Sequence, residues 1–177
     1  IFVASLLNAQ PMGFYSPRAL IMDAQRHGVK FKQVDVQESE YDYTIEDQEV
    51  RVGFRALYGL KQKHIDRLIA ERHSNGKFRD LQDLVRRTAL HKPTLMCLAA
   101  AGALNSLGLS PREALWKVQS LNVNPASLFF GHSSSEDAEH LPSENNWATL
   151  QREYGSQGYS LVHHPLGILR PALDRWS

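Results

Sequence analysis

A glycine turn that leads directly into a basic amphipathic helix has the chemistry to bind phosphate groups. The turn is Leu57-Tyr58-Gly59-Leu60-Lys61, and apolar residues follow it at helical spacing: Ile65, Leu68 and Ile69. Basic residues surround the predicted helix start: Lys61, Lys63 and Arg67. Glycine lets a backbone turn tightly and approach another molecule closely, and a helix N-terminus offers unpaired N–H groups and a positive dipole end. This junction predicts binding to a nucleic-acid backbone that is independent of base sequence.

A second turn of small residues, Ala101-Gly102-Ala103-Leu104, also follows a predicted helix, and its glycine lies 43 residues after Gly59. The two units indicate a weak internal duplication. Tandem helix-hairpin-helix modules pack back to back and bind both strands of a duplex through backbone amides, which positions a protein without reading sequence.

The charges are unevenly distributed, although the net charge is only +1. Residues 51–93 contain eleven Lys or Arg and four Asp or Glu, whereas residues 35–50 and 133–146 contain seven and four acids and no Lys or Arg. A basic centre between acidic segments favours a face directed at an anionic partner. The alternative is an ordinary solvated helical surface. The acids between Glu38 and Glu49 lie in a turn-rich stretch, and we expect them to be solvated.

Local patterns predict a small α+β unit followed by short helices. A helix should end near Ala9, and Ser16-Pro17 should begin another that stops at Gly28. The other expected elements are extended stretches at 30–36, 41–45 and 49–54 and helices at 62–73, 80–87, 93–101, after 110 and within 148–162. Ser110-Pro111-Arg112-Glu113 has the pattern of a capping box. Pro165 should open a tail interrupted by prolines.

These elements suggest a mainly α fold with a small α+β N-terminal part. The expected divisions are an α+β unit at 1–54, a tandem helix-hairpin-helix domain at 55–121, an acidic linker at 122–147 and a connector at 148–177. The aromatic residues Phe14, Tyr15, Tyr41 and Tyr43 are more simply explained by packing than by base stacking, whereas Tyr58 fits either role.

Several kinds of chemistry are absent from the sequence. Cys97 is the only cysteine and has apolar neighbours, which excludes an internal disulfide and favours a core position. The adjacent His163 and His164 lack metal-ligand spacing, and no phosphate loop or catalytic triad is present. We therefore expect no catalytic residue, metal site or cofactor. No apolar run approaches the roughly 18 residues of a membrane span, which favours a cytoplasmic protein without a membrane partner. An apolar start at Ile1, without Met, suggests a piece of a longer protein.

One segment is far more specific than the turns. Residues 6–17, Leu-Leu-Asn-Ala-Gln-Pro-Met-Gly-Phe-Tyr-Ser-Pro, resemble the fingers of bacterial C-family DNA polymerases, closest to the error-prone branch of the DNA polymerase III alpha subunit. The similarity continues through 23–29, then through Gly-Phe-Arg-Ala-Leu-Tyr-Gly-Leu at 53–60 and Phe-Arg-Asp-Leu-Gln-Asp-Leu at 78–84 to the second turn at 98–108. It is continuous to about residue 121 and resumes at 154–165, before the place of the family's OB-fold domain.

The resemblance implies a part in DNA synthesis on primer-template duplex. It implies that Gly59, Leu60, Lys61 and Lys63 contact one strand and that Gly102, Ala103 and Leu104 contact the other. Arg67 and Arg112 would add electrostatic support. The family's catalytic carboxylates lie in its palm, where two metal ions, expected to be Mg²⁺, assist nucleotidyl transfer. This chain lacks the palm motif and should be inactive alone.

Two positions depart from the family pattern. Many helix-hairpin-helix turns carry a second glycine where this chain has Lys61, whose Cβ restricts the backbone while its amine adds charge. Replicative relatives carry a sliding-clamp peptide with a Gln, but the matching stretch here is Ser127-Leu128-Phe129-Phe130, which keeps only an apolar anchor. These four residues are candidates for binding the clamp or another partner, such as an accessory mutagenesis protein, or for folding back onto the domain.

Two other functions fit the same turns. One is a helix-hairpin-helix module of a DNA repair nuclease or ligase, although such a module has no need of the fingers-like segment at 6–17. The other is a protein-interaction scaffold in a mutagenesis complex, in which the turns only pack.

Overall fold

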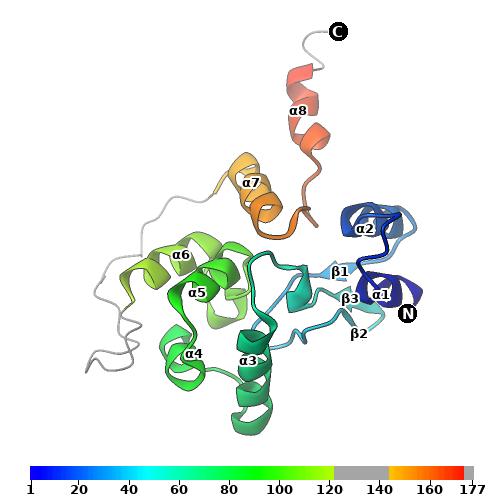
Figure 1. The fold of residues 1–177 in the computed structure, drawn as a ribbon. Helices are drawn as coiled ribbons and strands as arrows, with labels where there is room; N and C mark the ends of the chain where they lie inside the picture. Colours follow the sequence, from blue (N-terminus) through cyan, green and yellow to red (C-terminus); the bar gives the residue numbers. More distant parts are fainter. Residues whose placement is uncertain (122–143, 174–177) are drawn as a thin grey trace.

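The computed structural model describes residues 1–121 and 144–173, with side chains to Arg170. Helices dominate this part of the chain, and a small three-stranded sheet lies near the first two helices (Figure 1). The expected mainly α fold with a small α+β part is confirmed. None of the helices in these ranges is both long enough and apolar enough to cross a bilayer.

The N-terminal part contains α1 (Phe2–Asn8), α2 (Pro17–Arg26) and the three strands β1 (Phe31–Lys32), β2 (Thr44–Glu46) and β3 (Glu49–Arg51). The central strand β3 pairs in parallel with β1 and antiparallel with β2. The β2–β3 turn places Asp47 and Gln48 at positive φ, which matches the twist of a tight hairpin. The extended stretch expected at 30–36 pairs with β3 over two residues only, and further along it the Val36 amide bonds Ala103 outside the sheet.

The central part contains the 3₁₀ turn η1 (Phe54–Ala56), the helices α3 (Gln62–Asn75), α4 (Leu81–Thr88) and α5 (Lys92–Ala100), the turn η2 (Asn105–Leu107) and α6 (Pro111–Ser120). Helix starts follow the expected capping chemistry. The Asp80 side chain accepts a hydrogen bond from the Asp83 amide at 2.8 Å. Ser110 and Glu113 form the reciprocal bonds of a capping box, as expected. Gly76, at φ 74°, ends α3.

One hydrophobic cluster joins the N-terminal and central parts, from Ala4 on α1 to Tyr159 after α7. The segment 34–40 connects them further. The Val36 amide donates to the carbonyl of Ala103 at 2.9 Å, and the Gln37 side chain bonds both backbone groups of Phe78. Buried Arg72 of α3 donates to the carbonyls of Val36 and Ser39 and pairs with Glu40 at 2.5 Å. Tertiary contacts rather than local turns therefore fix how the central helices sit on the sheet.

The last helices are α7 (Asn146–Gln157) and α8 (Pro165–Leu173). Helix α7 packs against α5, and α8 extends away from the rest of the fold (Figure 1). Two expectations need correction here. Helix α7 begins at Asn146, inside the segment assigned to the linker, because Asn145 caps it by accepting from the Ala148 amide at 2.8 Å. The expected proline-interrupted tail is instead helical, since Pro165 stands at a helix start, where proline is tolerated.

The aromatic residues divide into two groups. Tyr43 is buried, and its hydroxyl lies 3.3 Å from that of Tyr159, while Tyr41 packs against the core. Phe14 and Tyr15 were expected to pack, but they are 89% and 64% exposed. They lie on a loop held by Gln10, whose side chain bonds the Tyr15 carbonyl and the Met12 amide.

Candidate nucleic-acid interface

The first hairpin leaves the N-terminus of α3 open to solvent. Gly59 is exposed and has φ 77°, a conformation that favours glycine. Lys61 occupies the N-cap position of α3 without a capping side-chain bond, and the first turn contains no acid. Four other helices have a side chain that caps their first turn, supplied by Ser16, Asp80, Ser110 and Asn145. The amides of Gln62 and Lys63 are therefore available to an anion, whereas the His64 amide donates to the Lys61 carbonyl at 2.9 Å.

The basic side chains around this turn have no acidic partner among the described residues. Lys61, Lys63 and Arg67 are exposed, and in the described ranges they make no ion pair. Arg79, Arg86 and Lys92 also lack one there, although Lys92 donates to the Gln119 carbonyl. The other five basic residues of segment 51–93 are ion-paired: Arg51, Arg55, Arg72, Lys77 and Arg87. Unpaired positive charge is thus concentrated on and beside α3–α5.

The acidic segment is the source of most of these ion pairs. Glu46 pairs with Arg51 at 2.8 Å, Asp42 with Arg55 at 2.7 Å, and Glu38 with Lys77. The Arg51 guanidinium lowers the pKa of Glu46 from its ordinary value. These acids were expected to be solvated, and Asp42 and Asp47 are exposed, but folding also pairs most of the acids with basic residues.

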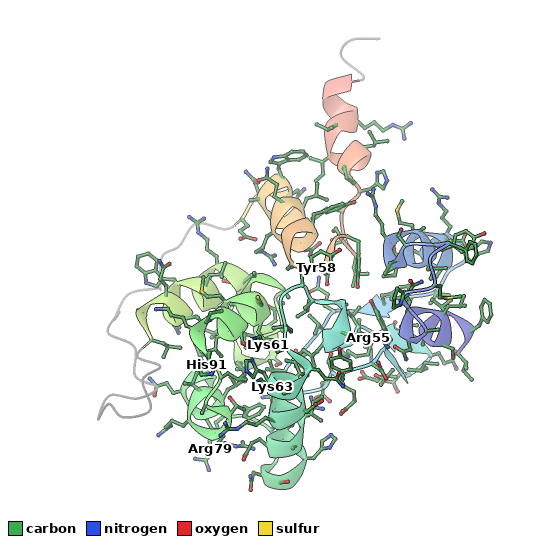
Figure 2. The ribbon with its side chains drawn as sticks, viewed as in Figure 1. Arg55, Tyr58, Lys61, Lys63, Arg79 and His91 are labelled. Atoms are coloured by element: carbon green, nitrogen blue, oxygen red, sulfur yellow. The ribbon has the colours of Figure 1, made fainter. Side chains whose placement is uncertain are left out.

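Two histidines lie where the starts of α3 and α5 meet. The rings of His64 and His91 stand edge to face with centroids 5.5 Å apart, and His64 Nδ1 lies 3.1 Å from the Thr94 hydroxyl. Desolvation, followed by the nearby His91, Lys63 and Lys61, lowers the pKa of His64. In Figure 2, Lys61, Lys63, His91 and Arg79 lie over α3–α5, whereas Arg55 lies toward α1 and the sheet. Spacing in sequence did not single out the two histidines, although His64 stands one turn after Lys61.

The second hairpin differs from the first. Gly102 has φ 74°, as a tight turn requires, but Gly102, Ala103 and Leu104 are all buried. The Gly102 and Ala103 amides donate to the carbonyls of Ala99 and Leu98, both at 3.0 Å, and so close the end of α5. Arg112 is exposed on the first turn of α6. The predicted contacts of the first hairpin are therefore mostly exposed, whereas those of the second hairpin are buried. Contact of the second hairpin with a DNA strand stays a prediction.

Tyr58 joins the first hairpin to α7. Its amide donates to the Ser156 carbonyl at 2.8 Å, and its hydroxyl lies against Gly158, where any side chain would collide with it. The side chain is nevertheless 60% exposed. Cys97 of α5 lies near Gly59 and is only half-buried, and burial raises the pKa of its thiol. The core position expected for Cys97 is therefore only partly realised.

Two further expectations concern metals and the clamp. Within residues 1–121 and 144–173 no three His, Cys, Asp or Glu side chains group as metal ligands would. The candidate partner-binding residues Ser127, Leu128, Phe129 and Phe130 lie outside the described residues.

Comparison with known proteins gives two findings. Residues 28–114 match a family described as a helix-hairpin-helix motif. Proteins named error-prone DNA polymerase are similar over nearly the whole chain: 44% identity over 98% of it in Bdellovibrio bacteriovorus, 41% over 99% in Alkalilimnicola ehrlichii and 39% over 98% in Mycobacterium tuberculosis. The chain spans only 16–17% of the length of these relatives. It is a homologue of one segment of the error-prone, C-family DNA polymerases and contains a helix-hairpin-helix domain.

Proposed function

We propose that this chain is the duplex-binding part of an error-prone DNA polymerase that acts in damage tolerance by translesion synthesis. Its first hairpin holds the phosphate backbone of the primer-template behind the active site. The observation that carries the proposal is the exposed, uncapped start of α3, which follows Gly59 directly and is flanked by the exposed Lys61 and Lys63.

The chemistry of this site suits a phosphate and not a base edge. The amides at the start of α3 supply donors and the positive dipole end, while the two lysines add mobile point charges. None of these groups presents the paired donor and acceptor pattern that distinguishes bases. Binding should therefore depend strongly on salt and little on sequence.

The polymerase reaction itself is proposed for the parent protein. Nucleotidyl transfer with Mg²⁺ needs carboxylates that hold two metal ions beside the primer end. The described residues provide no such group. In the parent protein, this chain would bind the duplex. We propose in addition that residues 127–130 contact a sliding clamp or accessory mutagenesis proteins.

Charge reversal at the hairpin tests the proposal. The variant Lys61→Glu/Lys63→Glu should bind every duplex more weakly, because two phosphate contacts become repulsive. The slope of log affinity against log salt should become shallower by about two. Fluorescence anisotropy with labelled duplexes of different sequence, from low to moderate salt, measures both quantities.

The matched control is Lys30→Glu/Arg170→Glu, which changes the net charge equally at exposed positions before β1 and on α8. It should retain most of the affinity and the original slope. If the hairpin variant and the control lose equal affinity, binding depends on net charge and the hairpin assignment is wrong. If the unaltered chain binds no duplex at low salt, the hairpins serve packing and the scaffold function is favoured.

A further inference from the structure

Two neighbouring cavities lie beside the first hairpin and share Arg18 and Tyr159 in their walls. One, of about 340 Å³, lies between α2 and residues 159–164. The other, of about 270 Å³, lies between the α1–α2 loop, Tyr43 and Tyr58 of the hairpin. Arg18 and Tyr159 stand between them, and together the two cavities reach from the hairpin to α2. We refer to the two cavities together as the α2 groove.

The walls of the α2 groove are basic. Their described residues include Arg18, Arg26, Arg55, His163 and His164 and not one Asp or Glu, in a chain that has 19 acids. Arg55 is already paired with Asp42, but Arg18 and Arg26 make no ion pair in the described ranges. Helical spacing explains their placement, since positions 18, 22 and 26 share one face of α2. Asp23 lies on another face, close to His27.

The groove also carries aromatic surface. The Arg18 guanidinium lies over the Tyr154 ring at 5.2 Å, and Tyr58 presents its exposed side chain at the hairpin end. Buried Tyr159 forms the shared wall, with its hydroxyl fixed against that of Tyr43. Basic side chains that follow a backbone, with aromatic rings on which bases stack, are the features of single-strand binding sites.

We propose that the α2 groove binds single-stranded DNA, separately from the duplex contact at the hairpin. The two cavities, of about 340 and 270 Å³, are near the lower end of the size of small-ligand pockets, which suits one nucleotide unit each. Arg18 and Arg26 contact successive phosphates, and Tyr154 supports a base. The proposed function enters only in naming the source of the strand, which is the unpaired part of a primer-template, and Tyr58 places the groove next to the duplex-binding hairpin.

The test is binding of labelled oligodeoxythymidylate to the 177-residue chain, measured by fluorescence anisotropy over a range of salt. The variant Arg18→Ala/Arg26→Ala should bind this probe more weakly, with a salt slope shallower by about 1.4, because each single-strand phosphate that a side chain neutralises contributes about 0.7 to the slope. Tyr154→Leu should weaken binding without changing the slope, because it removes stacking and no charge. The single variant Arg26→Ala, at an exposed side chain without an ion pair in the described ranges, guards against a folding defect.

Two comparisons separate this proposal from the duplex site. Lys30→Ala/Arg170→Ala removes the same charge at exposed positions that line neither cavity and lie outside α3–α5, and it should leave the slope for oligodeoxythymidylate nearly unchanged. Lys61→Glu/Lys63→Glu should reduce duplex affinity far more than single-strand affinity, and Arg18→Ala/Arg26→Ala should do the reverse. The groove proposal would be wrong if the Arg18/Arg26 variant and its control lost equal single-strand affinity, or if the chain bound no single strand at low salt. Neither result would contradict the duplex-binding proposal for the hairpin. Thymidine triphosphate that displaces the oligonucleotide at equal concentration would overturn the groove proposal as well, since the site would then recognise a free nucleotide.

Discussion

His64 is a titratable side chain at the first hairpin, and several positive or titratable groups lie close to it. It faces His91 and Thr94 from α5 and lies near Lys61 and Lys63 of its own helix start. Desolvation is the largest cause that lowers the pKa of His64, and the positive charges of His91, Lys63 and Lys61 lower it further. A bound phosphate would offset the second cause, because negative charge would then compensate the lysines.

Binding of duplex DNA should therefore change the pKa of His64. In the free chain it lies below 6.5, so below that pH the unfolded chain binds more protons and stability falls as the solution becomes acidic. Added duplex should raise the pKa, and duplex affinity should rise as pH falls through this region. The ring proton signal of His64, titrated by NMR with and without duplex, measures the change, and His64→Gln should abolish the pH dependence of affinity. A His64 pKa that duplex leaves unchanged would place the phosphate elsewhere.

The 3₁₀ turn η1 sets the direction in which the chain enters the hairpin, and Gly53 before it leaves no room for a side chain. A Cβ at this position would collide with the backbone of Tyr41 and Asp42, which cannot move aside as a flexible side chain can. The neighbouring amides of Phe54 and Arg55 hold the two segments together through the carbonyls of Glu40 and Tyr41.

Gly53→Ala should destabilise the fold by about 3 kcal/mol, the upper part of the usual range for overpacking. Gly155→Ala is the matched control, since a Cβ there, within α7, meets nothing within 4 Å. It should stabilise by about 0.5–1 kcal/mol, because alanine favours a helix more than glycine does. Thermal unfolding followed by circular dichroism compares the two, and equal midpoints would show that the 41–42 backbone yields.

Much of the element structure was predictable because it depends on neighbours in sequence. Ser16, Ser110 and Gly76 begin or end helices where their chemistry requires it. The short pairing of β1 was not predictable, since strand length depends on a partner further along the chain. The site shows the same division: the hairpin at Gly59 could be located from local pattern, whereas burial of Ala103 and Leu104 follows from packing against segments distant in sequence.

At the scale of the whole molecule, the acidic and basic segments neutralise each other. The sequence alone shows a surplus of positive charge across 51–93, but ion pairs with residues 38–46 remove part of it and leave the remainder over α3–α5. Which charges remain unpaired depends on tertiary structure. This is why the sequence indicated an anionic partner without showing which basic residues are free to contact it.

Arg72 is the most buried of the basic residues that pair with residues 38–46. Arg72→Met removes the donor of two buried backbone carbonyls and one partner of the partly exposed Glu40, and it should lower the unfolding free energy by about 1–3 kcal/mol. His73→Gln is the control, because His73 contacts the same carboxylate from an exposed position and should change stability by less than about 0.5 kcal/mol. Urea unfolding gives both values. A decrease below about 1 kcal/mol for Arg72→Met would mean that other contacts hold α3 on the sheet.

The bond from the Tyr58 amide to Ser156 has a consequence for modularity. The first hairpin is held by helix α7, whose Ser156 lies nearly a hundred positions further along the chain, after the acidic linker. A graft that exchanged only residues 55–121 between two polymerases would carry the phosphate-binding turn but leave its brace behind. The smallest transferable part extends through Gly158, so insertions and deletions between Leu121 and Glu144 are constrained to lengths that still return α7 to the hairpin.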